Sequence, residues 1–194
     1  MYKFIYKNIP ISELLLLAQK NDYKALEELI KREQKNVYAT FMYLSSDSNV
    51  VSDLTQEALI NMSRSIKNLK NIKNFKSWLN QIVLNVFYDD LRKKKKRLNT
   101  ISIEDSQGDD SHYLQIPDLK NKPVEKVLSQ ELDKIIKNKI KNLPENNRIA
   151  IVLRVFSGLS YDEIANVTKS TVGTVKSRIA RAREKLQKDL ANYI

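Results

Sequence analysis

The residues between Gly158 and Leu186 combine polar, basic and apolar side chains at spacings that suit contact with DNA. Ser160 and Glu163 stand at capping-box spacing, which predicts the start of a short helix. A polar turn at residues 168–170 separates this helix from a second one, which Thr171 opens. The apolar positions of the second helix recur every three or four residues and form one buried stripe: Val172, Val175, Ile179, Ala182 and Leu186.

Polar and basic side chains occupy the other side of the second helix. At about 100° per residue, the positions that fall away from the stripe are Ser170, Thr174, Ser177, Arg178 and Arg181, with Lys176 and Arg183 on its flank. A helix-turn-helix that places one helix in a DNA major groove needs this arrangement. An amphipathic helical hairpin with a solvated basic face shows the same periodicity, so periodicity alone leaves both interpretations open.

Composition favours a helical protein that binds a polyanion. The chain has 194 residues, 42% of them hydrophobic, and contains only three glycines and four prolines, which favours long helices with few tight turns. The formal charge of +11 is unevenly distributed: residues 1–97 carry +8, residues 98–124 carry −3 and residues 125–194 carry +6. Two basic blocks of this kind attract nucleic acid or an anionic membrane surface.

The residue types present disfavour several other kinds of site. Cysteine is absent, which removes disulfides and thiol chemistry and fits a cytoplasmic protein, and the single histidine, His112, has no partner for a metal site. Asp109 and Asp110 form an acidic pair, but an oxygen-only Mg²⁺ site needs further ligands on a rigid scaffold. The sequence has no Walker-type phosphate loop and no apolar run near the ~20 residues of a membrane span. We therefore expect no catalytic residue, no metal, no cofactor and no membrane insertion.

Hydrophobic periodicity predicts an all-α fold with two helical domains. The first domain, residues 1–97, is expected to hold four helices, at 11–20, 23–44, 50–67 and 75–97, with a Lys- and Asn-rich connector at 69–74. Residues 98–124 lose helical periodicity and gather acidic side chains, which predicts a flexible linker. The second domain, residues 125–194, begins with a helix up to Asn142, and Pro144 is expected at the first position of the next helix.

Two stretches of the chain resemble one protein family. From Leu143 to Leu186 the chain resembles region 4, the promoter-binding region of bacterial sigma-70 factors, particularly the small extracytoplasmic-function (ECF) group. The matching pieces are Leu143-Pro144, Arg148, Leu153-Arg154, Gly158 to Tyr161, Glu163 to Ala165, Gly173 to Arg178 and Arg181 to Arg183. Residues 53–97 resemble region 2 of the same family through Asp53 to Glu57, Phe75, Trp78-Leu79, Ile82, Asn85, Asp89 and Leu91-Arg92. The two matches follow the family's order along the chain.

The resemblance implies an alternative sigma factor, a subunit that binds core RNA polymerase and directs promoter-specific transcription initiation. Region 4 would recognise the −35 element through Arg154, Ser170, Thr171, Thr174, Lys176, Ser177, Arg178 and Arg181, with Lys176, Ser177 and Arg181 reading the element and Arg154 and Arg178 on the backbone. Region 2 would recognise and melt the −10 element through Lys70, Lys73, Asn74, Lys76, Asn85 and Arg92. Asp53, Gln56 and Glu57 would contact the clamp helices of the largest polymerase subunit, and the acidic linker would thread a basic channel of polymerase.

Other interpretations and two departures from the family remain. A stand-alone helix-turn-helix regulator would explain the C-terminal pattern but not the N-terminal one. Many relatives are held by an anti-sigma protein, although no residue here identifies one. Trp78 could stack on a base, but its place on an apolar stripe favours core packing. Leu84 stands where the family commonly has a basic residue, and Ala180 where relatives can carry a larger side chain.

Overall fold

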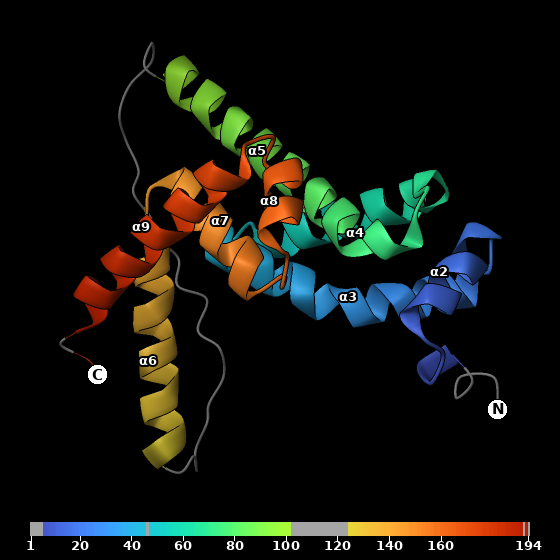
Figure 1. Ribbon diagram of the computed structural model, residues 1–194, viewed down its shortest axis with the longest axis horizontal. Coiled ribbons are helices and arrows are strands. Elements are labelled where there is room, and N and C mark those ends of the chain that lie inside the picture. The colour runs from blue at the N-terminus through green and yellow to red at the C-terminus, as the bar shows by residue number, and fades with distance from the viewer. Residues whose placement is uncertain (1–5, 46, 102–123, 192, 194) are drawn as a thin grey trace.

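Every regular element of the chain is a helix in the part that the structure describes. The computed structural model describes residues 6–45, 47–101, 124–191 and 193. The elements in chain order are α2 (Ile11–Gln19), α3 (Tyr23–Leu44), α4 (Val51–Ser65), the 3-10 turns η1 (Ile66–Asn68) and η2 (Ile72–Asn74), α5 (Phe75–Ile101), α6 (Val124–Lys141), α7 (Glu145–Val155), α8 (Tyr161–Val167) and α9 (Val172–Leu190) (Figure 1). The predicted all-α class is confirmed.

Local capping and apolar spacing explain the N-terminal helices. Asn21 adopts a positive φ of 69°, and the side chain of Asp22 then accepts hydrogen bonds from the backbone N–H groups of Lys24 and Ala25, at 2.9 and 3.1 Å. α3 therefore begins at Tyr23, as predicted. The apolar side chains of α3, α4 and α5 meet in one core whose largest members include Phe41, Met62 and Phe87.

The fourth predicted helix is longer than expected. α5 runs from Phe75 to Ile101, so it continues four residues beyond residue 97, where we expected the linker to begin. Helical propensity explains this, because the run Arg92 to Arg97 consists of good helix formers and no glycine or proline follows until Gly108. The rest of the predicted linker, with His112, Asp109 and Asp110, lies outside the described residues.

Arg148 connects the first two C-terminal helices. Its side chain is 8% exposed, and its Nη1 donates to the carbonyl oxygen of Lys141 at 2.6 Å, at the end of α6. A cation is favoured at a helix C-terminus, although burial lowers the pKa of this guanidinium. Pro144 is the N-cap of α7 rather than its first residue, so that prediction was wrong by one position.

The C-terminal helices pack directly on the N-terminal ones. α7 contacts α3, and α8 contacts α5, while α6 contacts α9 and α3 and extends away from the other helices at its opposite end (Figure 1). The buried apolar side chains of both halves form one continuous cluster. The sequence predicted two helical units but not this contact between them. Within the described residues, no helix has the length and hydropathy needed to cross a bilayer.

Candidate nucleic-acid interface

α8 and α9 form the predicted helix-turn-helix. The backbone N–H of Ser160 donates to Glu163 Oε2 at 2.7 Å, and the N–H of Glu163 donates to Ser160 Oγ at 3.2 Å, which completes the predicted capping box. Lys169 adopts a positive φ of 51° in the turn, and the N–H of Ser170 donates back to the Ala165 carbonyl at 2.9 Å. These bonds fix the direction in which α9 leaves α8.

Hydroxyl groups at the start of α9 bond within the motif. Thr171 Oγ1 accepts from the N–H of Thr174 at 3.1 Å and caps α9, as predicted. Ser177 Oγ donates to the Thr174 carbonyl at 2.9 Å, and the hydroxyls of Ser170 and Thr168 lie 2.8 Å apart. Their first role is therefore to shape the turn and the helix start.

Two cations stand on the outer side of α9. Val175, Ile179 and Ala182 are buried against the core, as the periodicity predicts. Lys176 and Arg181 lie away from this buried stripe and are exposed. Neither forms an ion pair with any described residue. They are free to approach a polyanion without first breaking a salt bridge.

Arg154 and Arg178 have neighbours in the protein. Arg154 Nη1 donates to the Leu159 carbonyl at 2.8 Å, and its guanidinium lies 5.1 Å from the centre of the Tyr161 ring. Arg154 thereby braces the turn between α7 and α8. Arg178 is partly exposed and lies close enough to Tyr88 of α5 to favour the ionised phenol, although burial has the larger effect and raises the pKa of Tyr88.

Four of the predicted −10 residues surround the connector between η1 and α5. Lys70, Lys73, Asn74 and Lys76 are all exposed. Asn71 caps η2 by accepting from the N–H of Lys73 at 2.9 Å. The exposed lysines make this a positively charged surface suited to a nucleic-acid backbone.

Gln19 holds the connector and was not predicted to do so. From the end of α2, its Nε2 donates to the carbonyls of Ile66 at 3.1 Å and Leu69 at 2.7 Å. These bonds satisfy two carbonyls where the chain leaves η1. Gln19 lies 47 and 50 positions away from the residues that it holds, so no local motif marks it.

A cleft of about 450 Å³ lies beside the connector and is closed on one side by α8. Its lining residues are Asn68, Leu69, Lys70, Asn71, Asn74, Ser77, Trp78 and Gln81 from the N-terminal half, and Glu163, Asn166 and Val167 from the C-terminal half. Trp78 is half-buried, packs 6.1 Å from the Phe75 ring and also faces this cleft. Trp78 therefore packs on the core, as the sequence favoured, and also has a side on the cleft.

Asn85 and Arg92 line a second cleft of about 720 Å³. Asn85 is exposed and accepts from Gln81 Nε2 at 3.2 Å, and Arg92 pairs with Asp89. The other wall is formed by Glu145, Thr168 and Lys169, so it includes the turn of the helix-turn-helix. Leu84 is fully buried in the core, which shows that this departure from the family serves packing rather than DNA contact.

The three residues expected to contact polymerase lie on the outer side of α4. Asp53 and Gln56 are exposed and Glu57 is half-exposed, while Leu54 and Ala58 point into the core. Ile60 extends this surface, and 47% of it is accessible. The sequence pattern assigned no role to Ile60.

Known proteins match the chain over both halves. Residues 29–97 match the family described as Sigma-70 region 2, and residues 133–186 match Sigma-70, region 4. The RNA polymerase sigma-H factor of Pseudomonas aeruginosa is 31% identical over 180 residues, which cover 92% of each chain. The ECF RNA polymerase sigma-E factor of Haemophilus influenzae is 35% identical over 174 residues, which cover 88% of this chain and 89% of the relative.

Solved structures show the same arrangement of helices. The sigma factor RpoE of Bartonella quintana, in complex with the anti-sigma factor NepR, matches with a TM-score of 0.68 and 26% identity, covering 87% of this chain and 98% of that one. CnrH, in complex with the cytosolic domain of CnrY, shares the fold with a TM-score of 0.65 and 21% identity, covering 93% and 97%. The chain therefore belongs to the ECF group of sigma-70 factors, the alternative sigma factors that direct RNA polymerase in transcription initiation.

Proposed function

We propose that this protein divides promoter recognition between two charged surfaces and attaches to polymerase through a third. The outer side of α9 enters the major groove of the −35 element, where Lys176, Ser177 and Arg181 approach base edges and phosphates. The cleft beside the connector captures an opened strand of the −10 element. Asp53, Gln56 and Glu57 on α4 contact the clamp helices of core polymerase.

The observation that carries this proposal is the position of Lys176 and Arg181. Both are exposed on the helix that follows the turn, and neither is engaged in an ion pair within the described structure. The hydroxyls of Thr171 and Thr174 hold the N-terminus of this helix in place. A helix with a fixed start and unpaired cations is suited to groove reading, because its backbone is already ordered before binding and no ion pair has to be broken.

The remaining residues have supporting roles in this proposal. Lys70, Lys73 and Lys76 neutralise phosphates of the opened strand, while Asn74 and Asn85 offer amide groups to base edges. Arg154 acts by bracing the turn before α8, since its guanidinium already bonds to Leu159 and stacks on Tyr161. The protein catalyses no reaction of its own, and it acts in the cytoplasm, where polymerase and promoter DNA meet.

Run-off transcription with bacterial core polymerase and genomic DNA tests the assignment. We expect promoter-specific transcripts that depend on this protein. Lys176→Ala and Arg181→Ala should each weaken recognition of the −35 element by about 1–3 kcal/mol. Lys188→Ala is the matched control, because Lys188 lies near the end of the same helix and pairs with Glu184. An equal loss of transcript in all three variants would contradict the proposed role of α9 in recognising the promoter.

A pull-down with core polymerase tests the α4 surface separately. Gln56→Ala and Glu57→Ala should reduce the amount of polymerase retained while the circular dichroism spectrum stays that of the wild type, because both side chains lie on the outside of the core. Gln187→Ala, an exposed change on α9, is the control. Retention equal to that of the control would place the polymerase contact elsewhere.

An anti-sigma protein is a further partner in this proposal. The structure of Bartonella quintana RpoE was solved in complex with such a factor, NepR. Reduced transcription on addition of a purified anti-sigma candidate, reversed by excess of this protein, would identify the partner.

A further inference from the structure

One apolar side chain of α9 lies on the side of the helix that faces away from the core. Val175, Ile179 and Ala182 are buried, whereas Ala180 is exposed. Every other exposed residue of α9 is polar, charged or glycine. At about 100° per residue, Ala180 points about 160° away from Ala182, so its methyl group is on the outer side of the helix.

Ala180 follows the two residues proposed to approach base edges along the same line of the helix. It lies one turn beyond Lys176 and Ser177, at about 40° and about 60° of rotation from them. The rise from Lys176 to Ala180 is about 6 Å, which is close to two base-pair steps of about 3.4 Å. Ala180 can therefore reach a base pair one or two steps beyond the base pair that Lys176 and Ser177 approach.

The surface suited to DNA ends one turn after Ala180. Glu184 lies about 40° of rotation from Ala180 and pairs with Lys188 at 2.8 Å. The phosphates of DNA would repel its carboxylate. Ala180 is thus the last residue on this line before a negative charge. Its small side chain also lets the helix backbone come close to the base edges.

A methyl group can recognise one kind of feature in the major groove. The base edges there carry hydrogen-bond donors and acceptors, and their apolar feature is the 5-methyl group of thymine. Alanine placed against a donor or an acceptor would deprive that group of water without replacing the hydrogen bond. Alanine placed against the thymine methyl group removes apolar surface of both groups from water, which stabilises the complex.

We propose that Ala180 reads the 5-methyl group of one thymine in the −35 element, one or two base pairs beyond the position that Lys176 and Ser177 approach. This inference rests on the proposed function of α9 and adds a specificity-determining residue to it. Either strand can supply the methyl group, because both strands present base edges in the major groove.

The test uses holoenzyme assembled from the full chain and core polymerase, with a promoter identified by run-off transcription. Each thymine of the −35 duplex is replaced in turn, on either strand, by deoxyuridine, which lacks only the 5-methyl group. Fluorescence anisotropy measures the affinity of holoenzyme for each duplex. The quantity compared is the ratio of the dissociation constants for deoxyuridine and thymine at one position, so a general loss of folded protein cancels.

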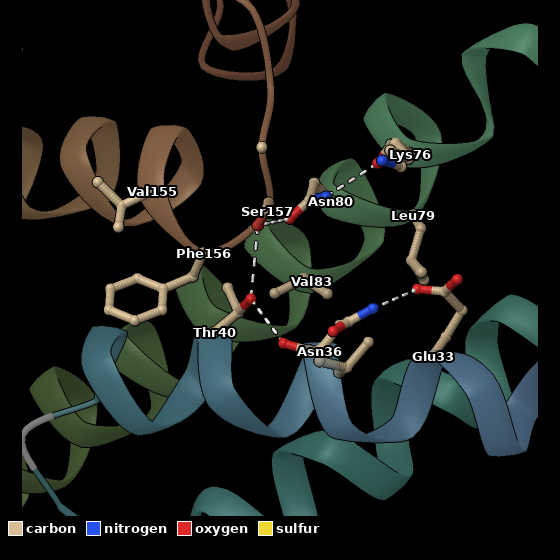
Figure 2. A pocket seen from close by; sticks show the side chains of 12 residues that line it. Glu33, Asn36, Thr40, Lys76, Leu79, Asn80, Val83, Val155, Phe156 and Ser157 are labelled. Atoms are coloured by element: carbon tan, nitrogen blue, oxygen red, sulfur yellow. Dashed lines mark hydrogen bonds between the residues drawn. The ribbon is translucent and has the colours of Figure 1, made fainter.

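Two substitutions remove the proposed methyl contact. Ala180→Gly deletes the methyl group, and Ala180→Ser, which disturbs the helix less, adds a polar hydroxyl at the same place. Ala180→Ser decides the test if Ala180→Gly does not fold. Val155→Ala is the matched control, because Val155 is an apolar residue of the same half that is 59% exposed and lies outside α9. Figure 2 shows Val155 at the end of α7, beside the cleft that residues of α3 and α5 also line.

The effect should be confined to one thymine and should depend on Ala180. Holoenzyme with the wild-type chain should bind about fourfold more weakly when that thymine becomes deoxyuridine, which is the effect of one buried methyl group. Both Ala180 variants should bind the two duplexes equally, and Val155→Ala should keep the wild-type ratio. The inference is overturned if the wild type shows no such position, if the ratio survives in the Ala180 variants, or if Val155→Ala also loses it.

Run-off transcription separates this inference from the proposed function. If transcripts are promoter-specific and Lys176→Ala and Arg181→Ala weaken −35 recognition while the Ala180 variants keep the deoxyuridine effect, the proposed function stands and the thymine contact fails. If no promoter-specific transcript depends on this protein, the proposed function itself fails, and the thymine contact fails with it.

Discussion

At the scale of single residues, two glycines of the C-terminal half should respond oppositely to the same substitution. Gly158 adopts a φ of +69° with no atom within 4 Å of an added Cβ, so Gly158→Ala costs only backbone strain, about 1–2 kcal/mol. Gly173 lies inside α9, and its added Cβ would meet only Thr171 Oγ1 at 3.9 Å, so Gly173→Ala should stabilise by up to about 1 kcal/mol. Urea unfolding measures both, and shifts of the same sign would contradict this account.

The residue types predicted the helix-turn-helix, but they could not show which of its hydroxyl groups bond within the protein and which face outward. Ser160 and Glu163 form the predicted capping box, and Thr171, predicted to open the second helix, is its N-cap. Ser170 and Thr174 were predicted on the DNA side, and their hydroxyls bond within the motif. Serine and threonine suit both a backbone partner and a base edge, so only the three-dimensional arrangement separates the two uses.

At the scale of elements, the connector should depend on a side chain from α2. Gln19→Ala removes two hydrogen bonds and leaves the Ile66 and Leu69 carbonyls without these partners, which should cost about 1–3 kcal/mol and loosen the charged loop. We expect weaker capture of a −10 single strand in holoenzyme, measured by fluorescence anisotropy. Gln34→Ala, an exposed change on α3, is the control, and an equal effect of both variants would show that Gln19 does not position the connector.

Helix positions followed closely from periodicity, and the errors lie where the pattern carries little information. α3 has the predicted bounds because Asp22 caps one end and a run of short polar residues follows the other. The end of α5, at Ile101, was predicted too early. A run of charged residues occurs both in solvated helices and in linkers, so the sequence pattern could not place this boundary. Gln19 was missed because its partners lie far along the chain.

At the scale of the whole molecule, the contact between the N-terminal and C-terminal halves could not be predicted from the sequence. Ser77 meets Glu163 across 86 positions, and Asn80 meets Ser157 across 77. Each of these residues also has an ordinary local explanation, as a cap, a turn residue or an exposed polar side chain. Composition indicated two basic bodies, and because like charges repel, their net charges gave no indication that the two bodies pack together.

The carboxylates of Glu163 in α8 and Glu33 in α3 should make the stability of the fold depend on pH in opposite directions. The Ser160 backbone N–H, with the Ser160 and Ser77 hydroxyls, holds the pKa of Glu163 below its ordinary value of 4.5. Between these two values the unfolded chain binds more protons, so the stability from Glu163 is lost as pH falls through that window. Burial raises the pKa of Glu33 above 4.5, so the folded protein binds more protons there and stability is lost as pH rises.

Substitution of each carboxylate separates the two contributions. Glu163→Gln should flatten the loss of stability below about pH 4.5, whereas Glu33→Gln should flatten the decline above it. Urea midpoints recorded across the acid range measure both slopes on the same protein. Because the two groups titrate on either side of one value, each variant serves as the control for the other. A slope that changes on the same side of pH 4.5 in both variants would mean that these carboxylates do not hold the environments described.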